Sequence, residues 1–181
     1  MVITVLLGIL IFLAWVIWLV VHKIMKIFVK TFSKKNVSQM NKYLANMKYF
    51  KMSNVQFSMG RGLLTDHCLA IDDDHKLICI LELRDKLIKE NVYKYEVLKS
   101  CEIVENGINV TNEICLIVIF NVTANSVYKF NFMPYGRHEI SYRKYMEITR
   151  NWHDILSIII ERNQEERLKA KGNYIARQTG T

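Results

Sequence analysis

The chain opens with an almost continuous apolar run. Val2 to Val21 contains no charged side chain, and Thr4 is its most polar residue. As an α-helix, this run would span about 30 Å, the thickness of the hydrocarbon core of a bilayer. No basic residue precedes the run and no small-x-small cleavage pattern follows it, so a cleaved signal peptide fits less well. The pattern therefore predicts a transmembrane helix over residues 1–21, with Trp15 and Trp18 suited to the membrane interface.

The pattern becomes amphipathic directly after Val21. The lysines that follow step by three and four residues, which places them on one face of a helix. We expect residues 22–52 to form a basic juxtamembrane segment that either prolongs the transmembrane helix or lies along the lipid headgroups. A solvated basic linker is the alternative. The predicted membrane-surface residues are Lys23, Lys26, Lys30, Lys34 and Lys35.

From Ser53 onward, apolar residues come in short runs separated by turn residues, which is typical of antiparallel strands. Tyr128, Phe130 and Phe132 alternate with their neighbours, which directs one aromatic stripe toward a core. The loop SMGRG, residues 58–62, is expected to open this domain. The predicted strands are 64–71, 76–83, 91–98, 100–104, 114–121 and 126–133, with 108–111 as a short additional candidate.

A long C-terminal helix is predicted from Ser141 to about Lys171, after the connector that contains Pro134. Its apolar residues recur every three or four positions and form one face that can cover a sheet. Ser141 is expected to cap its first turn. The sequence turns polar near its end, so residues 164–181 are expected to be a polar tail into which the helix frays. The apolar face comprises Tyr145, Ile148, Trp152, Ile155, Leu156 and Ile159.

Three ordered blocks resemble a family of bacterial domains of the pleckstrin-homology (PH) or GRAM type. They are AID at residues 70–72, CEIVENG at 101–107 and YRKYMEITRNW at 142–152. The resemblance covers about residues 64–163. It implies an α+β fold over residues 53–163, in which a PH-like antiparallel sandwich or barrel of six or seven strands is capped by the C-terminal helix. It also implies a binding function and no reaction.

Charge is distributed unevenly along the chain. Residues 1–65 hold nine Lys and Arg and no acidic residue, whereas residues 66–181 hold 16 basic and 17 acidic residues, a net −1. Basic residues beside a membrane span mark its cytoplasmic side, so the domain is expected in the cytoplasm, beneath a plasma membrane or a bacterial inner membrane. Anionic headgroups of the inner leaflet are the expected counter-surface, and each basic residue near them contributes about 1 kcal/mol.

The sequence DDDH, residues 72–75, is the most conspicuous candidate for chemistry. A calcium loop that begins at Asp72 would need acidic ligands at its fifth and twelfth positions and glycine at its sixth. Those positions hold Lys76, Leu83 and Leu77. Asp is also favoured in turns, where its side chain accepts local backbone hydrogen bonds. We therefore interpret DDDH as a hairpin turn.

No other constellation points to catalysis, a metal or a cofactor. The four cysteines are spaced 11, 22 and 14 residues apart and form no CxxC pair. His67 and Cys68 are adjacent in a predicted strand, so their side chains point to opposite faces. The strand aromatics, which include Tyr93 and Tyr95, fit core packing better than stacking on nucleic acid, since no arginines cluster with them.

The sequence predicts a non-enzymatic, single-pass membrane protein whose cytosolic domain binds a protein partner. Homo-oligomerisation is an additional expectation. The alternative is a membrane effector of a bacterial or mobile-element defence system, in which a cytosolic sensor triggers oligomerisation and membrane perturbation. Residues 2–21 carry no strongly polar side chain to line a pore, which favours the first hypothesis.

Overall fold

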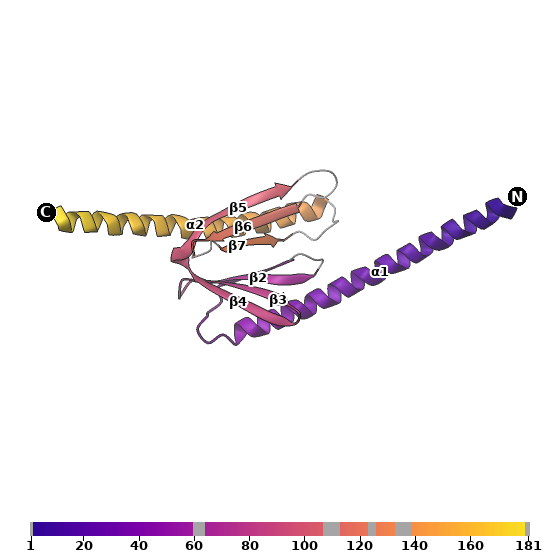
Figure 1. Cartoon of the computed structure of the whole chain (residues 1–181), viewed down its shortest axis with the longest axis horizontal. Helices are drawn as coiled ribbons and strands as arrows, with labels where there is room; N and C mark the ends of the chain where they lie inside the picture. The colour runs from indigo at the N-terminus through magenta and orange to yellow at the C-terminus, as the bar shows by residue number, and fades with distance from the viewer. Residues whose placement is uncertain (1, 60–63, 107–112, 123–125, 133–138, 180–181) are drawn as a thin grey trace.

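A computed structural model describes residues 2–59, 64–106, 113–122, 126–132 and 139–179. The two long helices leave a β domain toward opposite ends, so the termini lie far apart along the longest axis (Figure 1). The elements, in chain order, are α1 (Val2–Ala45), β1 (Asn54–Met59), β2 (Thr65–Asp72), β3 (Leu77–Arg84), β4 (Leu87–Lys94), the 3-10 helix η1 (Tyr95–Val97), β5 (Leu98–Asn106), β6 (Glu113–Phe120), β7 (Ser126–Asn131) and α2 (Glu139–Thr179).

The seven strands are connected in the order β4-β3-β2-β1-β7-β6-β5. Among the described residues, β1 and β7 are joined by one pair, Met59 opposite Asn131, so the strands divide there into two antiparallel sheets, β4-β3-β2-β1 and β7-β6-β5. On the other side η1 carries the chain directly from β4 to β5. The predicted α+β class, with antiparallel strands followed by a long C-terminal helix, is confirmed at this level.

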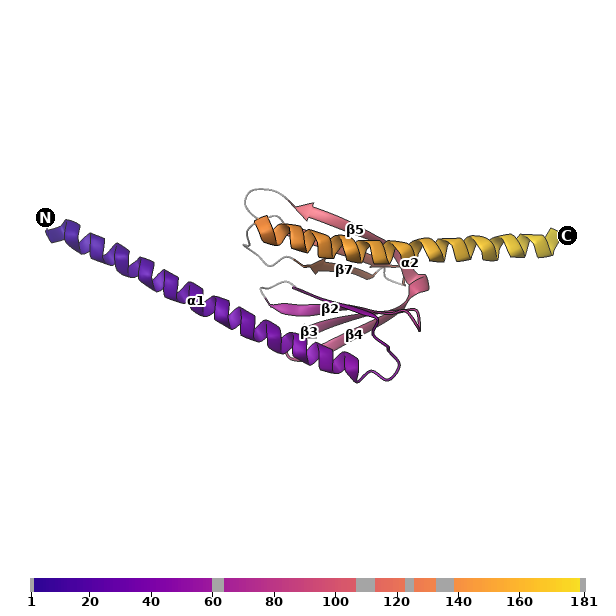
Figure 2. The same cartoon turned by 180° about the vertical axis from the view of Figure 1, so that it is seen from behind.

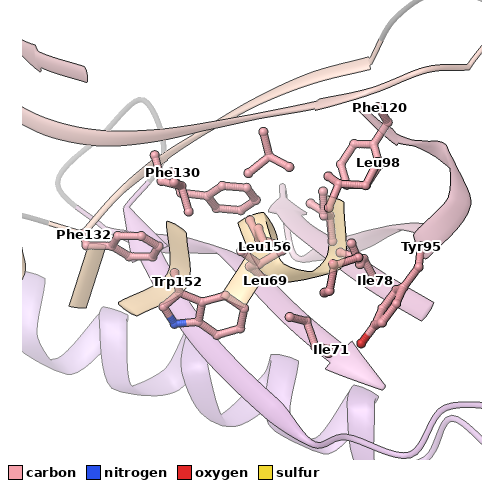
Figure 3. Packing of buried hydrophobic residues seen from close by; sticks show 14 residues of the cluster. Leu69, Ile71, Ile78, Tyr95, Leu98, Phe120, Phe130, Phe132, Trp152 and Leu156 are labelled. Atoms are coloured by element: carbon pink, nitrogen blue, oxygen red, sulfur yellow. The ribbon is translucent and has the colours of Figure 1, made fainter. Parts of the chain in front are cut away.

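The main core, which we call the inner cluster, lies between the two sheets and is closed by α2 (Figure 3). The predicted aromatic stripe is confirmed: Phe130 and Phe132 are buried, and Tyr128 packs against the same cluster. The predicted face of α2 is also confirmed, since Trp152 and Leu156 enter this core. The aromatic residues of the strands therefore serve packing.

A second core, the outer cluster, lies on the opposite face of the first sheet and is covered by the end of α1. Figure 2 shows α1 running along this sheet while α2 lies along the other. Strands β2 and β3 are consequently buried on both faces. The buried members are Met40, Leu44, Met47, Phe50, Cys68, Ala70, Cys79, Leu81 and Leu83.

Two strand boundaries differ from the prediction. Ser58 and Met59 were expected in the loop that opens the domain but belong to β1, a strand that the sequence pattern did not predict; residues 60–62 lie outside the described residues. Strand β4 begins at Leu87 instead of residue 91, because Asp85 and Lys86 form a two-residue hairpin turn with φ of 49° and 67°. Such left-handed turns usually contain Gly or Asn, so this one carries little sequence signal.

Other boundaries agree more closely. Strands β2, β3, β6 and β7 match their predicted ranges to within one or two residues, and β5 extends the predicted 100–104 at both ends. Helix α2 begins at Glu139, so Ser141 lies inside the helix and the predicted cap is wrong. The helix also continues to Thr179, beyond its predicted end near Lys171. The additional candidate strand at 108–111 lies outside the described residues.

Candidate membrane-surface site

Helix α1 is long and apolar enough to cross a membrane. It runs without interruption from Val2 to Ala45, so the basic segment is helical as far as residue 45 and continues the axis of the apolar run. Of the forms expected for residues 22–52, the structure shows a helix that prolongs the apolar run through residue 45. The chain leaves the helix through turns at residues 46–50 before β1.

The five predicted membrane-surface lysines are all exposed, but they do not share one face. Lys23, Lys26, Lys30 and Lys34 fall within about 80° of one another around α1, at 3.6 residues per turn. Lys35 lies about 100° beyond Lys34, on another side of the helix. The structure thus groups four of the five lysines and separates the fifth.

The domain is attached to the last turns of α1 by polar contacts as well as by the outer cluster. Ser33 Oγ accepts from the backbone N–H of Thr65 at 3.3 Å, and Asn36 Nδ2 donates to the Thr65 carbonyl at 2.9 Å. One turn later Gln39 Nε2 donates to the Lys86 carbonyl at 3.1 Å. The start of β2 and the β3–β4 turn therefore lie beside residues 33–39, closest to the apolar run.

Glu90 on β4 ties the end of α1 and the following turn to the sheet. Tyr43 donates its hydroxyl to Glu90 Oε2 at 2.6 Å, and Tyr49 donates to Oε1. The hydrogen bond to Glu90 is the main cause that raises the pKa of both tyrosines, that of Tyr49 to about 12. Sequence reasoning missed this contact because nothing in the local pattern relates residues 47 positions apart.

The DDDH stretch is a hairpin turn, as predicted, and it also holds the loop that follows α1. Asp72 is fully buried and accepts from the backbone N–H groups of Lys51 at 2.6 Å and His75 at 2.9 Å. His75 Nδ1 lies 2.7 Å from the same carboxylate. Burial acts to raise the pKa of Asp72, but these hydrogen bonds outweigh it and the net pKa is lowered.

The other two carboxylates of the turn also have protein partners. Asp73 Oδ1 accepts from the Tyr95 hydroxyl at 2.7 Å, and Asp74 lies 2.6 Å from Lys51 Nζ. Because Lys51 lies beyond the end of α1, the acidic turn is at the end of the domain remote from the apolar run. Its carboxylates are occupied in holding β2, η1 and the loop after α1 together.

The thiols lie in surroundings that keep them protonated. Cys68 and Cys79 are fully buried in the outer cluster. Burial raises the pKa of both thiols, that of Cys79 to about 12. His67 is on the opposite face of β2 from Cys68, as predicted, and its Nδ1 lies 2.6 Å from Asp66 Oδ1. A thiolate–imidazole pair does not form there.

A polar row crosses the inner face of the first sheet, and sequence reasoning missed it. Ser58 lies opposite His67, and His67 lies opposite Glu82, on three adjacent strands. Ser58 and Glu82 are buried, and Arg84 Nη2 lies 3.1 Å from Glu82 Oε2 without an aligned hydrogen bond. Within the described residues, Ser58 Oγ, Glu82 Oε2 and Asn91 Nδ2 find no hydrogen-bond partner. The alternation of polar and apolar residues in β1, NVQFSM, is the sequence pattern that could have indicated this row.

Comparisons with protein-family models, curated proteins and solved structures gave no match for this chain. The function of the chain is therefore inferred from its own sequence and geometry.

Proposed function

We propose that this chain is a single-pass membrane protein whose cytosolic, PH-like domain binds a protein partner without catalysing a reaction. One observation carries the proposal: α1 is a single helix whose first half is apolar on all sides and whose last turns are part of the domain core. An anchor built into the core in this way fixes the domain at the membrane, which raises its effective concentration toward any partner there.

The PH-like assignment is supported by the topology. A four-stranded and a three-stranded antiparallel sheet, joined at one side and closed by a C-terminal helix, agree with the fold that the AID, CEIVENG and YRKYMEITRNW blocks suggest. The binding role is supported by the surroundings of the reactive groups. The turn carboxylates hold local structure, and the buried thiols Cys68 and Cys79 have raised pKa values.

The position of the acidic turn within the domain is consistent with the cytoplasmic orientation that the charge distribution predicts. If α1 crosses the membrane, its lysines follow the span on the cytoplasmic side, and the acidic turn at Asp72–His75 lies at the far end of the domain. Anionic headgroups would repel that turn, so its position remote from the anchor is favourable. Helix α2 extends still further from the anchor (Figure 1), and its residues 164–171 are exposed and mostly polar.

A shallow groove between β5 and the first half of α2 is the surface we assign to the partner. Its volume is about 890 Å³, and it is lined by Tyr142, whose hydroxyl donates to Glu105 at 2.8 Å, and by Ile148. Arg143 and Arg150 flank them together with Glu147. Aromatic and aliphatic side chains among charges of both signs are typical of protein interfaces.

Site-specific photo-crosslinking in the native cell tests this function. A photoreactive residue at Arg143 should give a discrete crosslink to another protein, and the same residue at exposed Lys99 serves as the matched control. Crosslinks from Arg143 only to further copies of this chain would contradict partner binding and favour the membrane-effector alternative. Release of the full chain from membranes by alkaline carbonate would contradict the anchor.

A further inference from the structure

Between residues 22 and 36, the surface of α1 divides into three sectors. The domain sector contains Ser33 and Asn36, which bond to β2, and continues into Met40. The basic sector contains Lys23, Lys26, Lys30 and Lys34, centred about 90° around the helix from the domain sector. The third sector, about 130° from the lysines, is apolar apart from Thr31, whose hydroxyl donates to the Ile27 carbonyl of the same helix at 2.9 Å. Since α1 is one continuous helix fixed to the sheet, these sectors cannot rotate relative to the domain.

The apolar sector continues the membrane span on one side of the helix. Its large side chains are exposed in the isolated chain: Ile27 by 68%, Ile24 by 59% and Phe28 by 47%. Phe32 completes it, with its ring 4.2 Å from that of Phe28 between centroids. The sector ends at Lys35, the lysine that is separated from the other four.

The opposite side of α1 becomes polar much earlier. Trp15 and Trp18 lie there, and Trp18 stacks on His22 with ring centroids 5.4 Å apart. The change from apolar to polar thus occurs near His22 on one side and at Lys35 on the other, an axial difference of about 20 Å. An α-helix with its side chains is only about 10–12 Å wide. A flat membrane surface can therefore cross its two sides at points this far apart along the axis only if the axis is steeply tilted from the bilayer normal.

We propose that α1 crosses the bilayer with a tilt steeper than the average of about 20° and with one fixed rotation about its axis. Ile24, Ile27, Phe28 and Phe32 then lie in the boundary between acyl chains and headgroups. Lys23, Lys26, Lys30 and Lys34 extend from the other side to lipid phosphates, as lysines near helix ends do. The domain sector faces away from the bilayer, which leaves the groove beside α2 open to the cytosol.

The occupant of the apolar sector is the lipid boundary and not a second copy of the chain. The sector is continuous with the apolar run that lipid already surrounds in the proposed function, on which this inference rests. The lysines beside it match anionic headgroups, whereas two copies packed along this sector would bring two Lys35 side chains together. Like charges at such an interface would oppose association.

Labelling with a membrane-impermeant maleimide tests whether protection by lipid depends on the side of α1 that a residue occupies or only on its position along the helix. Single cysteines replace Lys30 or Phe32 in the full chain carrying C101S, since the remaining native cysteines are fully buried. The proteins are reconstituted in phosphatidylcholine–phosphatidylglycerol vesicles, and each rate is normalised to the rate in dodecyl sulfate. Phe32 is further along the helix from the span than Lys30, so depth alone predicts faster labelling at F32C. The proposal predicts that F32C reacts about 10-fold more slowly than K30C.

A cysteine in place of Leu13 keeps this inference distinguishable from the proposed function. If L13C is protected while F32C reacts as fast as K30C, the span stands and the tilted arrangement is wrong. If F32C is protected but forms disulfide-linked dimers that disappear on dilution with lipid, a second copy covers the sector, which also overturns the proposal. If L13C itself reacts rapidly from outside the vesicles, the transmembrane anchor fails.

Discussion

The two long helices of this protein have the same construction but opposite chemistry. Each packs one part of its length against the β domain and extends the other part beyond it (Figures 1 and 2). The extending part of α1 is apolar on all sides over residues 2–21, whereas that of α2 presents charged and polar side chains. The packed parts are similar in that each fills a core. Packing therefore explains where the helices attach, and the extending parts indicate the medium that each one enters.

The largest effect is expected from the packed part of α2. Trp152→Ala removes a nearly fully buried side chain from the inner cluster and should destabilise the domain by about 3–5 kcal/mol. Denaturant unfolding in detergent, followed by far-UV circular dichroism, measures this loss. Leu168→Ala on the extending part of the same helix, where the side chain is 70% exposed, should change stability little. Equal effects of the two changes would remove the distinction between packed and extending parts.

The corresponding change in α1 should be somewhat milder. Leu44→Ala opens a cavity in the outer cluster and should cost about 2–4 kcal/mol. Because the inner cluster remains intact, the first consequence should be detachment of the helix end from the sheet. Limited proteolysis should then cleave at residues 46–53 in the variant and not in the parent. Lys42→Ala, on the exposed side of the same turn, is the matched control. Cleavage of that variant at residues 46–53 as well would mean that the helix end is only loosely attached.

The acidic turn provides a test of the attachment that depends on pH. Asp72→Asn weakens hydrogen bonds to a charged acceptor and should cost about 2 kcal/mol at neutral pH. The folded-state pKa of Asp72 is lowered, so its contribution is complete above the unfolded value near 4 and is lost as pH falls through the folded value. The difference in the free energy of unfolding between the parent and Asp72→Asn should therefore become smaller below pH 4. Asp74→Asn, at an exposed ion pair, should show no comparable gap.

The smallest effect concerns the tyrosines that hold Glu90. In Glu90→Gln the charged acceptor is lost, so the pKa of Tyr49 should fall from about 12 toward the ordinary 10. The tyrosinate absorbance during an alkaline titration reports this change directly. Tyr142, whose pKa is raised mainly by its hydrogen bond to Glu105, serves as an internal reference that should not move. An unchanged titration would show that Glu90 does not hold Tyr49 in solution.

Sequence reasoning located most of the fold where apolar residues face one core. It succeeded for β2, β3, β6, β7 and the packed face of α2. It missed β1 because the residues on its inner face, Gln56 and Ser58, are polar, while Val55 and Phe57 pack toward the outer cluster. That second core exists only because the end of α1 covers the sheet, a tertiary arrangement that no local pattern records.

The candidate site was also predicted only in part, because some of its features are local in sequence and others depend on tertiary structure. The spacing of Lys23, Lys26, Lys30 and Lys34 was sufficient to place them together, because helical periodicity is local. The same periodicity separates Lys35 from them. The contact of Glu90 with two tyrosines and the buried Ser58–His67–Glu82 row depend instead on helix packing and on strand register. Register depends on turns such as Asp85–Lys86, whose residues are not those usually found in left-handed turns.

The seam between the two sheets has a mechanical consequence. Helix α1 is fixed to β2 and β3, whereas α2 is fixed to η1, β5 and β6. A pull between the membrane anchor and anything bound to α2 must therefore pass from one sheet to the other. Among the described residues, the Met59–Asn131 backbone pair, the η1 connection, the Tyr93–Tyr128 hydroxyl contact at 2.7 Å and the side chains of the inner cluster carry that load. Under tension the domain should part along this seam before either helix is drawn from its own sheet.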